Sequence, residues 1–294
     1  MIVEEYVFYK DRLYLLIWQE NIFWVRGDNI DNSMYYIGID IGSTAAKVTV
    51  LHEEQVDHFV LPTGWSSKET AKLIRNNIEN QYKINMDDSN VRTVATGYGR
   101  ISVEYADFEI TEITCHARGG KELSKAHDTT IIDVGGQDTK VISLENGFVS
   151  DFLMNDKCSA GTGRFIEIMA NKLNLTLEEL FDLADRGEVI EISAMCTVFA
   201  ESEVINYIGE GRNKEDIAAG VIDSVAKKVA QLAGRAKVKD DVILTGGLSN
   251  VDYFAKVLGD KLHTKVYTTE NGKFAGSYGA ALLAKEKKKR WQIL

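Results

Sequence analysis

The feature that most constrains the fold is a nine-residue pattern found at residues 40–48 and again at residues 133–141. Both copies have an aspartate, a glycine two positions later and a lysine seven positions after the aspartate. Each copy joins two short apolar runs, so each predicts two strands connected by a tight turn. An internal repeat of this size predicts two similar subdomains that each contribute one acidic, glycine-containing hairpin.

Around these turns, short apolar runs alternate with longer amphipathic stretches, which is typical of an α/β protein. Asn146-Gly147 predicts a hairpin turn after the second repeat. A helical face from Ile217 to Ala233 is expected to begin after Asp216 as N-cap and to end at Gly234. The expected strands are 36–41, 47–51, 131–134, 139–144 and 242–244.

Composition excludes several classes of protein. The 294 residues include 34 Lys and Arg against 44 Asp and Glu, and this net charge of −10 disfavours a general nucleic-acid binder. No apolar run reaches the roughly 18 residues of a membrane helix, and Glu4 and Glu5 stand where an export signal needs positive charge. Three cysteines make no disulfide framework, so we expect a cytoplasmic protein. Because no apolar run is long enough, we expect no membrane contact. Residues 1–33 are expected to be a peripheral extension.

The repeated turns suit phosphate chemistry. Glycine lets backbone N–H groups approach a polyphosphate, so Gly42, Ser43 and Thr44 could form one anion nest. Gly135, Gly136 and Gln137 could form its counterpart across a cleft. Asp40 and Asp133 lie at strand ends, where a carboxylate can hold Mg²⁺ through its waters, and Lys47 would add a positive charge. An ordinary hairpin is the alternative for either turn alone, but the matched pair favours the phosphate interpretation. The candidate catalytic residues are Asp40, Asp133 and Gln137.

Two cysteines precede expected helices. Cys158 comes before a helical face of Phe165, Ile168, Met169 and Leu173, and Cys196 comes before a second helix with acidic residues expected in its first turn. A helix N-terminus eases ionisation of a thiol and favours an anionic cluster. The cysteines lie too far apart for a Cys-x-x-Cys motif, so two buried thiols remain an alternative. A cubane cluster takes four thiolates, so a twofold dimer would be needed to complete the site.

A third glycine signal, Gly246-Gly247, follows the apolar run 242–244. With the two repeated turns, it resembles the actin-like ATPase fold of sugar kinases, acetate kinase, the seventy-kilodalton chaperones and actin. This resemblance implies two RNase H-like subdomains with ATP or ADP in the cleft between them, and an adenosine group at Gly246 and Gly247. It also implies that Lys214 and Glu215 lie near the adenosine.

The segments 155–165, 196–203 and 111–117 are similar to the activator, component A, of 2-hydroxyacyl-CoA dehydratases, in the BadF/BadG/BcrA/BcrD ATPase family. The likeness runs from about residue 34 to residue 285. It implies that Cys158 and Cys196 bind one 4Fe-4S cluster shared by a homodimer. Cys115 is then left over as a buried or near-site thiol, and His116 is expected to be structural.

The family resemblance implies an ATPase coupled to electron transfer. Such a protein takes an electron from ferredoxin or flavodoxin and passes it at low potential to the dehydratase, component D. The alternatives are an N-acetylglucosamine-type small-molecule kinase of the same fold, a non-catalytic iron-sulfur scaffold or sensor, and an ATP-binding subunit of a benzoyl-CoA reductase-like complex. The expected subdomain I comprises residues 34–128 and 276–294, and subdomain II comprises residues 129–275.

Overall fold

The computed structural model describes residues 5–9, 12–16, 33–193, 196–239 and 241–287. The chain divides into two compact units, residues 1–34 and residues 35–294. In the first unit, β1 (Glu5–Tyr9) pairs with β2 (Arg12–Leu16) as an antiparallel hairpin. Every feature described below belongs to the second unit.

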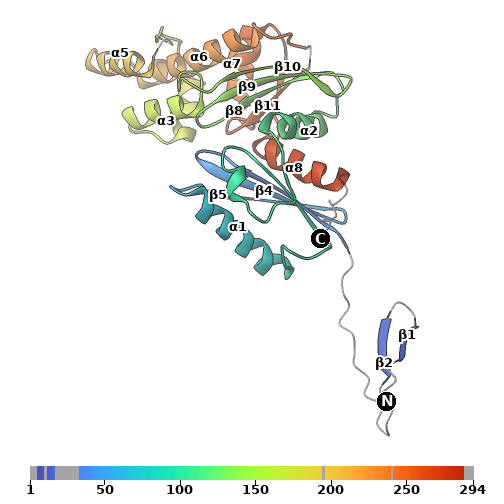
Figure 1. Cartoon of the computed structure of the whole chain (residues 1–294). Helices are drawn as coiled ribbons and strands as arrows, with labels where there is room; N and C mark the ends of the chain where they lie inside the picture. Colours follow the sequence, from blue (N-terminus) through green and yellow to red (C-terminus); the bar gives the residue numbers. More distant parts are fainter. Residues whose placement is uncertain (1–4, 10–11, 17–32, 194–195, 240, 288–294) are drawn as a thin grey trace. The chain divides into compact units, whose positions relative to one another are not determined.

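The described part of this second unit holds two five-stranded sheets of the same topology (Figure 1). The first has the order β5-β4-β3-β6-β7, and the second has the order β10-β9-β8-β11-β12. In each sheet, three antiparallel strands are followed by two parallel ones, which confirms the repeat predicted from the two turns. The first sheet contains β3 (Tyr35–Ile41), β4 (Ala45–His52), β5 (Gln55–Pro62), β6 (Val91–Thr96) and β7 (Phe108–Glu109). The second contains β8 (Thr129–Val134), β9 (Thr139–Glu145), β10 (Phe148–Asn155), β11 (Val242–Gly246) and β12 (Val266–Tyr267).

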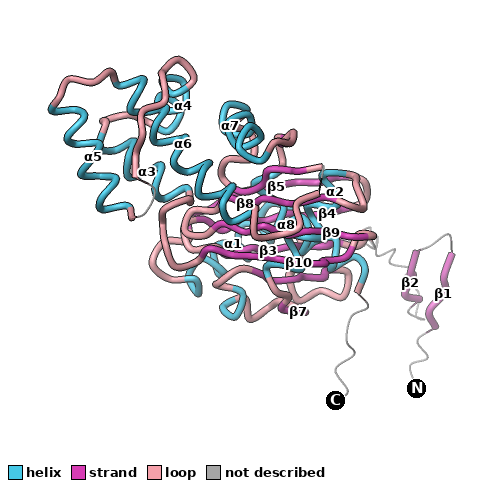
Figure 2. Tube along the Cα trace, turned by 90° about the horizontal axis from the view of Figure 1, so that it is seen from above, coloured by secondary structure: helices cyan, strands magenta, loops and turns pink. Residues whose placement is uncertain are grey.

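Helices cover both sheets. Figure 2 shows α3, α4 and α5 grouped at one end of the second unit. The α-helices are α1 (Ser67–Tyr82), α2 (Glu112–Ser124), α3 (Gly163–Lys172), α4 (Leu177–Ala184), α5 (Thr197–Gly209), α6 (Lys214–Ala233), α7 (Asp252–Leu262) and α8 (Ala275–Glu286). Two 3₁₀ turns, η1 (Arg100–Ser102) and η2 (Gly272–Phe274), precede β7 and α8. Among the described residues, no helix is long and apolar enough to span a bilayer.

Helices α2 and α8 lie side by side between the two sheets (Figure 1). Their backbones approach so closely that a Cβ on Gly279 would stand 1.8 Å from the Cys115 carbonyl oxygen. A Cβ on Gly119 would stand 1.9 Å from the carbonyl oxygen of Ala275. Helix α8 also packs on β3 and β6, whereas α2 packs its apolar side on the second sheet. This helix pair therefore joins the two sheets; the subdomain limits at residues 128 and 275 stay a prediction.

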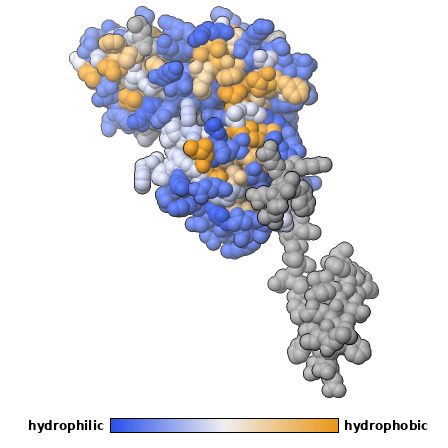
Figure 3. Space-filling view, viewed as in Figure 1, coloured by the Kyte–Doolittle hydropathy of each residue, from blue (hydrophilic) through white to orange (hydrophobic). Residues whose placement is uncertain are grey.

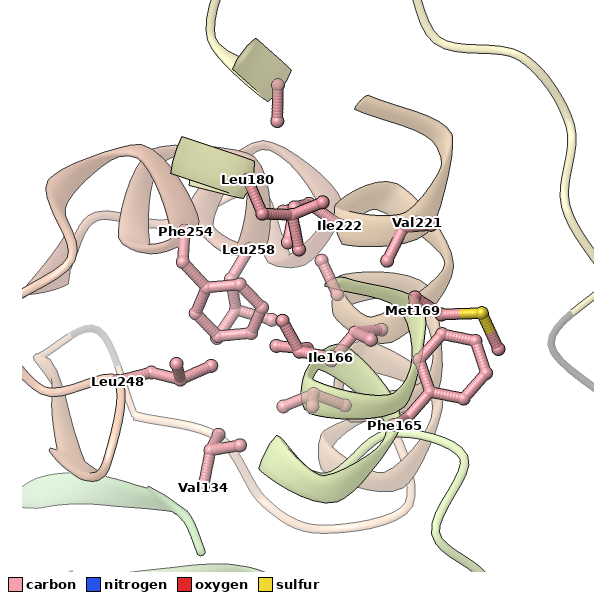
Figure 4. Packing of buried hydrophobic residues seen from close by; sticks show 14 of the residues in the cluster. Val134, Phe165, Ile166, Met169, Leu180, Val221, Ile222, Leu248, Phe254 and Leu258 are labelled. Carbon is pink, nitrogen blue, oxygen red and sulfur yellow. The ribbon is translucent and has the colours of Figure 1, made fainter. Parts of the chain in front are cut away.

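The largest core lies between the second sheet and its covering helices. Figure 4 shows Phe165, Ile166 and Met169 of α3 packed toward α6, with Phe254 and Leu258 of α7 nearby. At about 25 cal/mol per Å² of apolar surface, burial of such side chains is the main stabilising contribution of this half. The core fixes the start of α3, and through it the loop that carries Cys158.

Several local signals in this half of the chain can be compared with the structure. Asn146 and Gly147 have φ of 53° and 78° and close a two-residue turn between paired Glu145 and Phe148. Gly234 is the C-cap of α6, as predicted. The predicted N-cap, Asp216, is wrong: Asn213 takes that position, and the Asp216 carboxylate accepts a bond from the Glu188 amide at 2.8 Å instead.

Candidate functional site

The two repeated turns open onto one cavity of about 190 Å³. In the strand register, Asp40 of β3 lies opposite Lys47 of β4, and Asp133 of β8 lies opposite Lys140 of β9. Both aspartates lie near the ends of central strands, so their carboxylates reach the same hollow. The sequence-predicted residues that line it are Asp40, Gly42, Ser43, Thr44, Lys47, Asp133, Gly135, Gly136, Gln137, Gly246 and Gly247.

The walls of this cavity approach one another closely. A Cβ on Gly136 would lie 2.6 Å from Thr44 Oγ1, so the two turns are in near contact. Gly246 has φ of 83°, and a Cβ there would meet the Val134 carbonyl oxygen at 2.4 Å. Only glycine adopts that conformation and leaves that space at low cost. The third glycine signal thus belongs to the same site as the first two.

Asp40 lines the cavity and has one carboxylate oxygen without a hydrogen-bond partner among the described residues. Its side chain is buried, yet Oδ1 has no hydrogen-bond partner among the described residues. A Cβ on Gly276 of α8 would stand 2.4 Å from Asp40 Oδ2, so glycine there leaves room for the carboxylate. A buried carboxylate oxygen without a donor is costly unless a cation or an ordered water meets it. This donor fits Mg²⁺, which is bound through one or two carboxylates and several waters.

In contrast, both carboxylate oxygens of Asp133 have polar partners. Its Oδ1 accepts a bond from Thr245 Oγ1 at 3.0 Å and lies 3.4 Å from His116 Nε2. Its Oδ2 lies 3.4 Å from the Lys140 ammonium. Burial opposes ionisation of Asp133, but the charges of His116 and Lys140 outweigh burial and lower its pKa. Asp133 is therefore held as a carboxylate.

Lys140 is the centre of a buried charge cluster. Its Nζ lies 2.7 Å from Asp138 Oδ1 and 2.8 Å from Glu112 Oε1. Burial opposes its charge, but Asp133, Glu112 and Asp138 together raise the pKa of Lys140. The charge of Asp133 also favours the protonated form of His116: it raises the pKa of His116 to about 9, although burial lowers it. The ring of His116 donates from Nδ1 to the Glu112 carbonyl at 3.1 Å.

Sequence reasoning missed several residues that line the cavity. Lys140 could have been found, because the repeat aligns it with Lys47. The others were not singled out from the sequence, and all except Asp138, which lies within the second turn, come from elements outside the two turns. They are Tyr98, Glu112, Asp138, Glu167 and Lys273. His116 also lines the cavity, where it contacts the Glu112 carbonyl of α2 and Asp133, and the structural role expected for it stays a prediction.

Lys214 and Glu215 lie outside the residues that line this cavity. Both begin α6, and the Lys214 ammonium donates to the Leu173 carbonyl at 3.2 Å. Their contact with an adenosine group stays a prediction.

The cysteines occupy three different environments. Cys158 is exposed in the loop before α3, whose N-cap is Thr162, and Cys196 is the half-buried N-cap of α5. The acidic residues expected in the first turn of that helix are not there, because α5 begins at Thr197 and Glu201 falls in its second turn. Cys115 is buried in α2, and burial raises the pKa of its thiol to about 12.

A side-chain bond joins the segments of the two accessible cysteines. Ser159 Oγ and Thr197 Oγ1 are 2.7 Å apart, one residue after Cys158 and Cys196 respectively. Soft thiolates are the usual ligands of an iron-sulfur cluster, and both thiols are free. No group of three or more His, Cys, Asp or Glu side chains with metal-site geometry occurs in the described part of the chain. The donor set therefore fits half of a four-thiolate site.

Known proteins are similar to this chain in sequence and in fold. The model of the BadF/BadG/BcrA/BcrD ATPase family matches residues 37–284. The (R)-2-hydroxyglutaryl-CoA dehydratase activating ATPase of Acidaminococcus fermentans is 41% identical over 260 residues, which cover 87% of this chain and 98% of that protein.

Two solved structures agree closely. Component A of the A. fermentans (R)-2-hydroxyglutaryl-CoA dehydratase has a TM-score of 0.79 at 39% identity, covering 86% of this chain and 99% of that one. The activator of the 2-hydroxyisocaproyl-CoA dehydratase from Clostridium difficile, with bound ADPNP, has a TM-score of 0.79 at 36% identity, covering 89% and 99%. These likenesses and the two matched sheets confirm the predicted α/β, actin-like ATPase fold.

Proposed function

The chain belongs to the BadF/BadG/BcrA/BcrD ATPase family, and from that premise we propose that it is an ATP-hydrolysing activator of a 2-hydroxyacyl-CoA dehydratase. The observation that carries this proposal is the joint placement of two glycine turns and two carboxylates around one cavity. The relatives that are about 40% identical over most of the chain are activators of such dehydratases, which supports the same role here. In this proposal the dehydratase, and not the activator, selects which 2-hydroxyacyl-CoA is dehydrated.

In this proposal the cavity binds ATP or ADP with Mg²⁺. The amides of Gly42 and Gly135 donate to the Ala45 and Asp138 carbonyls within their own turns. The amides of Ser43 and Thr44 would therefore face one side of the phosphates, and those of Gly136 and Gln137 would face the other. Mg²⁺, when bound, neutralises charge on the phosphate oxygens. Asp40, whose Oδ1 has no partner among the described residues, and Asp133 would hold it through its waters. Lys47 would supply a positive charge, and Gln137, which lines the cavity, would orient a water molecule.

Cys158 and Cys196, with the same pair from a second copy, would hold one 4Fe-4S cluster. The cluster, when bound, supplies one-electron transfer at low potential. Helix α5, which begins directly after Cys196, carries exposed apolar side chains along its length, namely Val198, Phe199, Ile205 and Ile208. Figure 3 shows apolar surface over this helix. Such a surface is suited to burial against another chain, which supports a homodimer.

The electron donor in this scheme is ferredoxin or flavodoxin, and the acceptor is component D of the dehydratase. Free thiols and a low-potential cluster require a reducing compartment, so we place the protein in the cytoplasm.

The decisive experiment compares Cys158→Ser with Cys115→Ser after purification without oxygen. We expect the native protein and Cys115→Ser to be brown dimers with four irons per two chains. Cys158→Ser should lose the iron and keep nucleotide binding, because the cavity does not include that thiol. Full iron content in Cys158→Ser would refute the ligand assignment. A colourless monomer that phosphorylates a sugar would instead support the kinase alternative.

A further inference from the structure

We propose that Thr139 is a positioning residue that couples the second glycine turn to the loop carrying Cys158. This inference rests on the proposed function, because it concerns how nucleotide in the cavity acts on the cysteine ligands. It names a side chain that lies outside the residues lining the cavity and is not itself a ligand of the cluster.

The first observation is a short buried bond. Thr139 is the first residue of β9, follows the second turn directly, and is 1% exposed. Its Oγ1 donates to the Gly161 carbonyl at 2.6 Å, across 22 positions of sequence. Gly161 has φ of 87° and lies three residues after Cys158. A side chain at the end of the turn thus holds the backbone of the cysteine loop.

Two backbone bonds join the same segments. The amide of Gly163 donates to the Gly135 carbonyl at 2.9 Å, and that of Arg164 donates to the Gly136 carbonyl at 2.9 Å. Gly163 begins α3, so the start of this helix rests on the turn proposed to face the phosphates. A phosphate that engages the amides of that turn will reorient its peptide planes, and their carbonyl oxygens carry the bonds to the loop.

Hydrogen bonds within the cysteine loop would transmit a movement of the second turn to the two thiols. Asn155 Nδ2 donates to the Cys158 carbonyl at 2.9 Å, and Thr162 Oγ1 donates to the Ser159 carbonyl at 2.8 Å. The bond from Ser159 to Thr197 continues the connection to the N-terminus of α5, beside Cys196. A movement of the second turn therefore changes the placement of Cys158 first and of Cys196 second.

Thr139 makes this connection testable, because its bond comes from a hydroxyl and the other two come from backbone. Thr139→Val keeps the shape of the side chain and removes that bond. Loss of one hydrogen bond should weaken the coupling about 2- to 10-fold. Thr129→Val is the matched control: Thr129 is a buried threonine of the adjacent strand whose Oγ1 bonds the Asp241 carbonyl at 3.0 Å, away from the cysteine loop.

The experiment uses the full chain without iron and measures the rate of iodoacetamide labelling of Cys158, resolved from the other thiols by peptide mass spectrometry. Rates are compared without nucleotide and with saturating Mg-ADP or Mg-ADPNP. In the native protein, nucleotide should change the rate about fivefold or more. Thr139→Val should lose most of this response with nucleotide affinity kept within about twofold, and Thr139→Ser, which restores the hydroxyl, should recover it.

Thr129→Val should respond like the native protein. A full response in Thr139→Val, or no response in a native protein that binds nucleotide, would overturn the inference. Absence of nucleotide binding to the native protein would instead overturn the proposed function. If Thr139→Val does not fold, hydrogen exchange of the Gly163 and Arg164 amides in the native protein decides: unchanged protection on nucleotide binding contradicts the coupling.

Discussion

The two hairpins share one sequence pattern and differ in what their charged residues contact. In the first, Lys47 makes no ion pair within the described residues, and Asp40 Oδ1 accepts no hydrogen bond there. In the second, Lys140 contacts three carboxylates and Asp133 contacts two cations and a hydroxyl. The charged residues of the second copy therefore satisfy one another, whereas in the first copy one carboxylate oxygen has no hydrogen-bond partner among the described residues.

The helices between the sheets account for this difference. Helix α2 brings Glu112 and His116 to the second hairpin, where they complete the charge cluster. Helix α8 brings Gly276 to the first hairpin, and the missing side chain leaves room for the Asp40 carboxylate without supplying a charged partner. The chemistry of each copy is thus decided by the element packed against it and not by the shared turn.

The largest expected effect separates the two lysines. Lys140→Met leaves Asp133, Asp138 and Glu112 without their cation, and breaking a buried ion pair on one side costs about 3–5 kcal/mol of unfolding free energy. Lys47→Met should cost less than about 1 kcal/mol, because no ion pair is broken in the described structure. Urea unfolding of both variants measures the difference. Equal losses would show that the two hairpins do not differ in this way.

Substitutions of the two aspartates should differ in their effects on both activity and stability. Asp40→Asn removes charge from the proposed Mg²⁺ donor, so we expect ATP hydrolysis to fall about 100-fold or more with the urea midpoint unchanged or raised. Asp133→Asn breaks contacts with His116 and Lys140, so its main effect should be a lower urea midpoint. Hydrolysis and unfolding are measured on the same preparations. A stable Asp133→Asn protein beside an unstable Asp40→Asn protein would reverse the assignment.

Much of this site could be predicted from local sequence. Turn glycines and strand-end aspartates act over a few residues, so the two copies of the pattern were enough to predict the hairpins and the pairing of Asp40 with Asp133 around one cavity. Gly246 was predictable for the same reason, since the apolar strand before it and its glycine pair are local signals.

The difference between the two copies was not predictable. Glu112 lies 28 positions before Lys140, and their contact depends on how α2 packs on the second sheet. The N-cap of α6 was misplaced for a similar reason, because the Asp216 carboxylate bonds Glu188, which is distant in sequence. Side chains committed by tertiary packing leave no periodic or local mark on the sequence.

The contrast between open and closed environments extends to the thiols. Cys115 is buried and burial raises its pKa to about 12, whereas Cys158 is exposed. At pH 8 in iron-free protein, we expect iodoacetamide to label Cys158 about tenfold faster or more than Cys115, because the thiolate is the reactive form. Peptide mass spectrometry gives both rates, and labelling in urea, where all thiols are exposed, is the control. Similar native rates would mean that α2 opens readily.

The smallest effect concerns pH and the first sheet. Oγ1 of Thr49 in β4 and Nδ1 of His58 in β5 form a hydrogen bond of 2.9 Å. The repeat aligns Thr49 with Ile142 of β9 in the second copy. Burial lowers the pKa of His58 from 6.5, with Asp57 opposing and Lys273 adding to the shift. The groups that face His58 are Thr49, Asp57, Lys273, Phe274 and Tyr278.

Because the folded pKa of His58 lies below the unfolded value, the fold favours the neutral ring. Its contribution to stability is present above pH 6.5 and is lost as pH falls from 6.5 through the lower folded pKa. We expect a small fall in the urea midpoint between pH 7.5 and pH 5.5 that is reduced in His58→Gln, whose amide does not titrate in this range. The equivalent position in the second hairpin is apolar, so Ile142→Val, which adds no titrating group, should keep the full native pH response. An equal fall in native protein and His58→Gln would place the acid sensitivity elsewhere, because both proteins share every other titrating group.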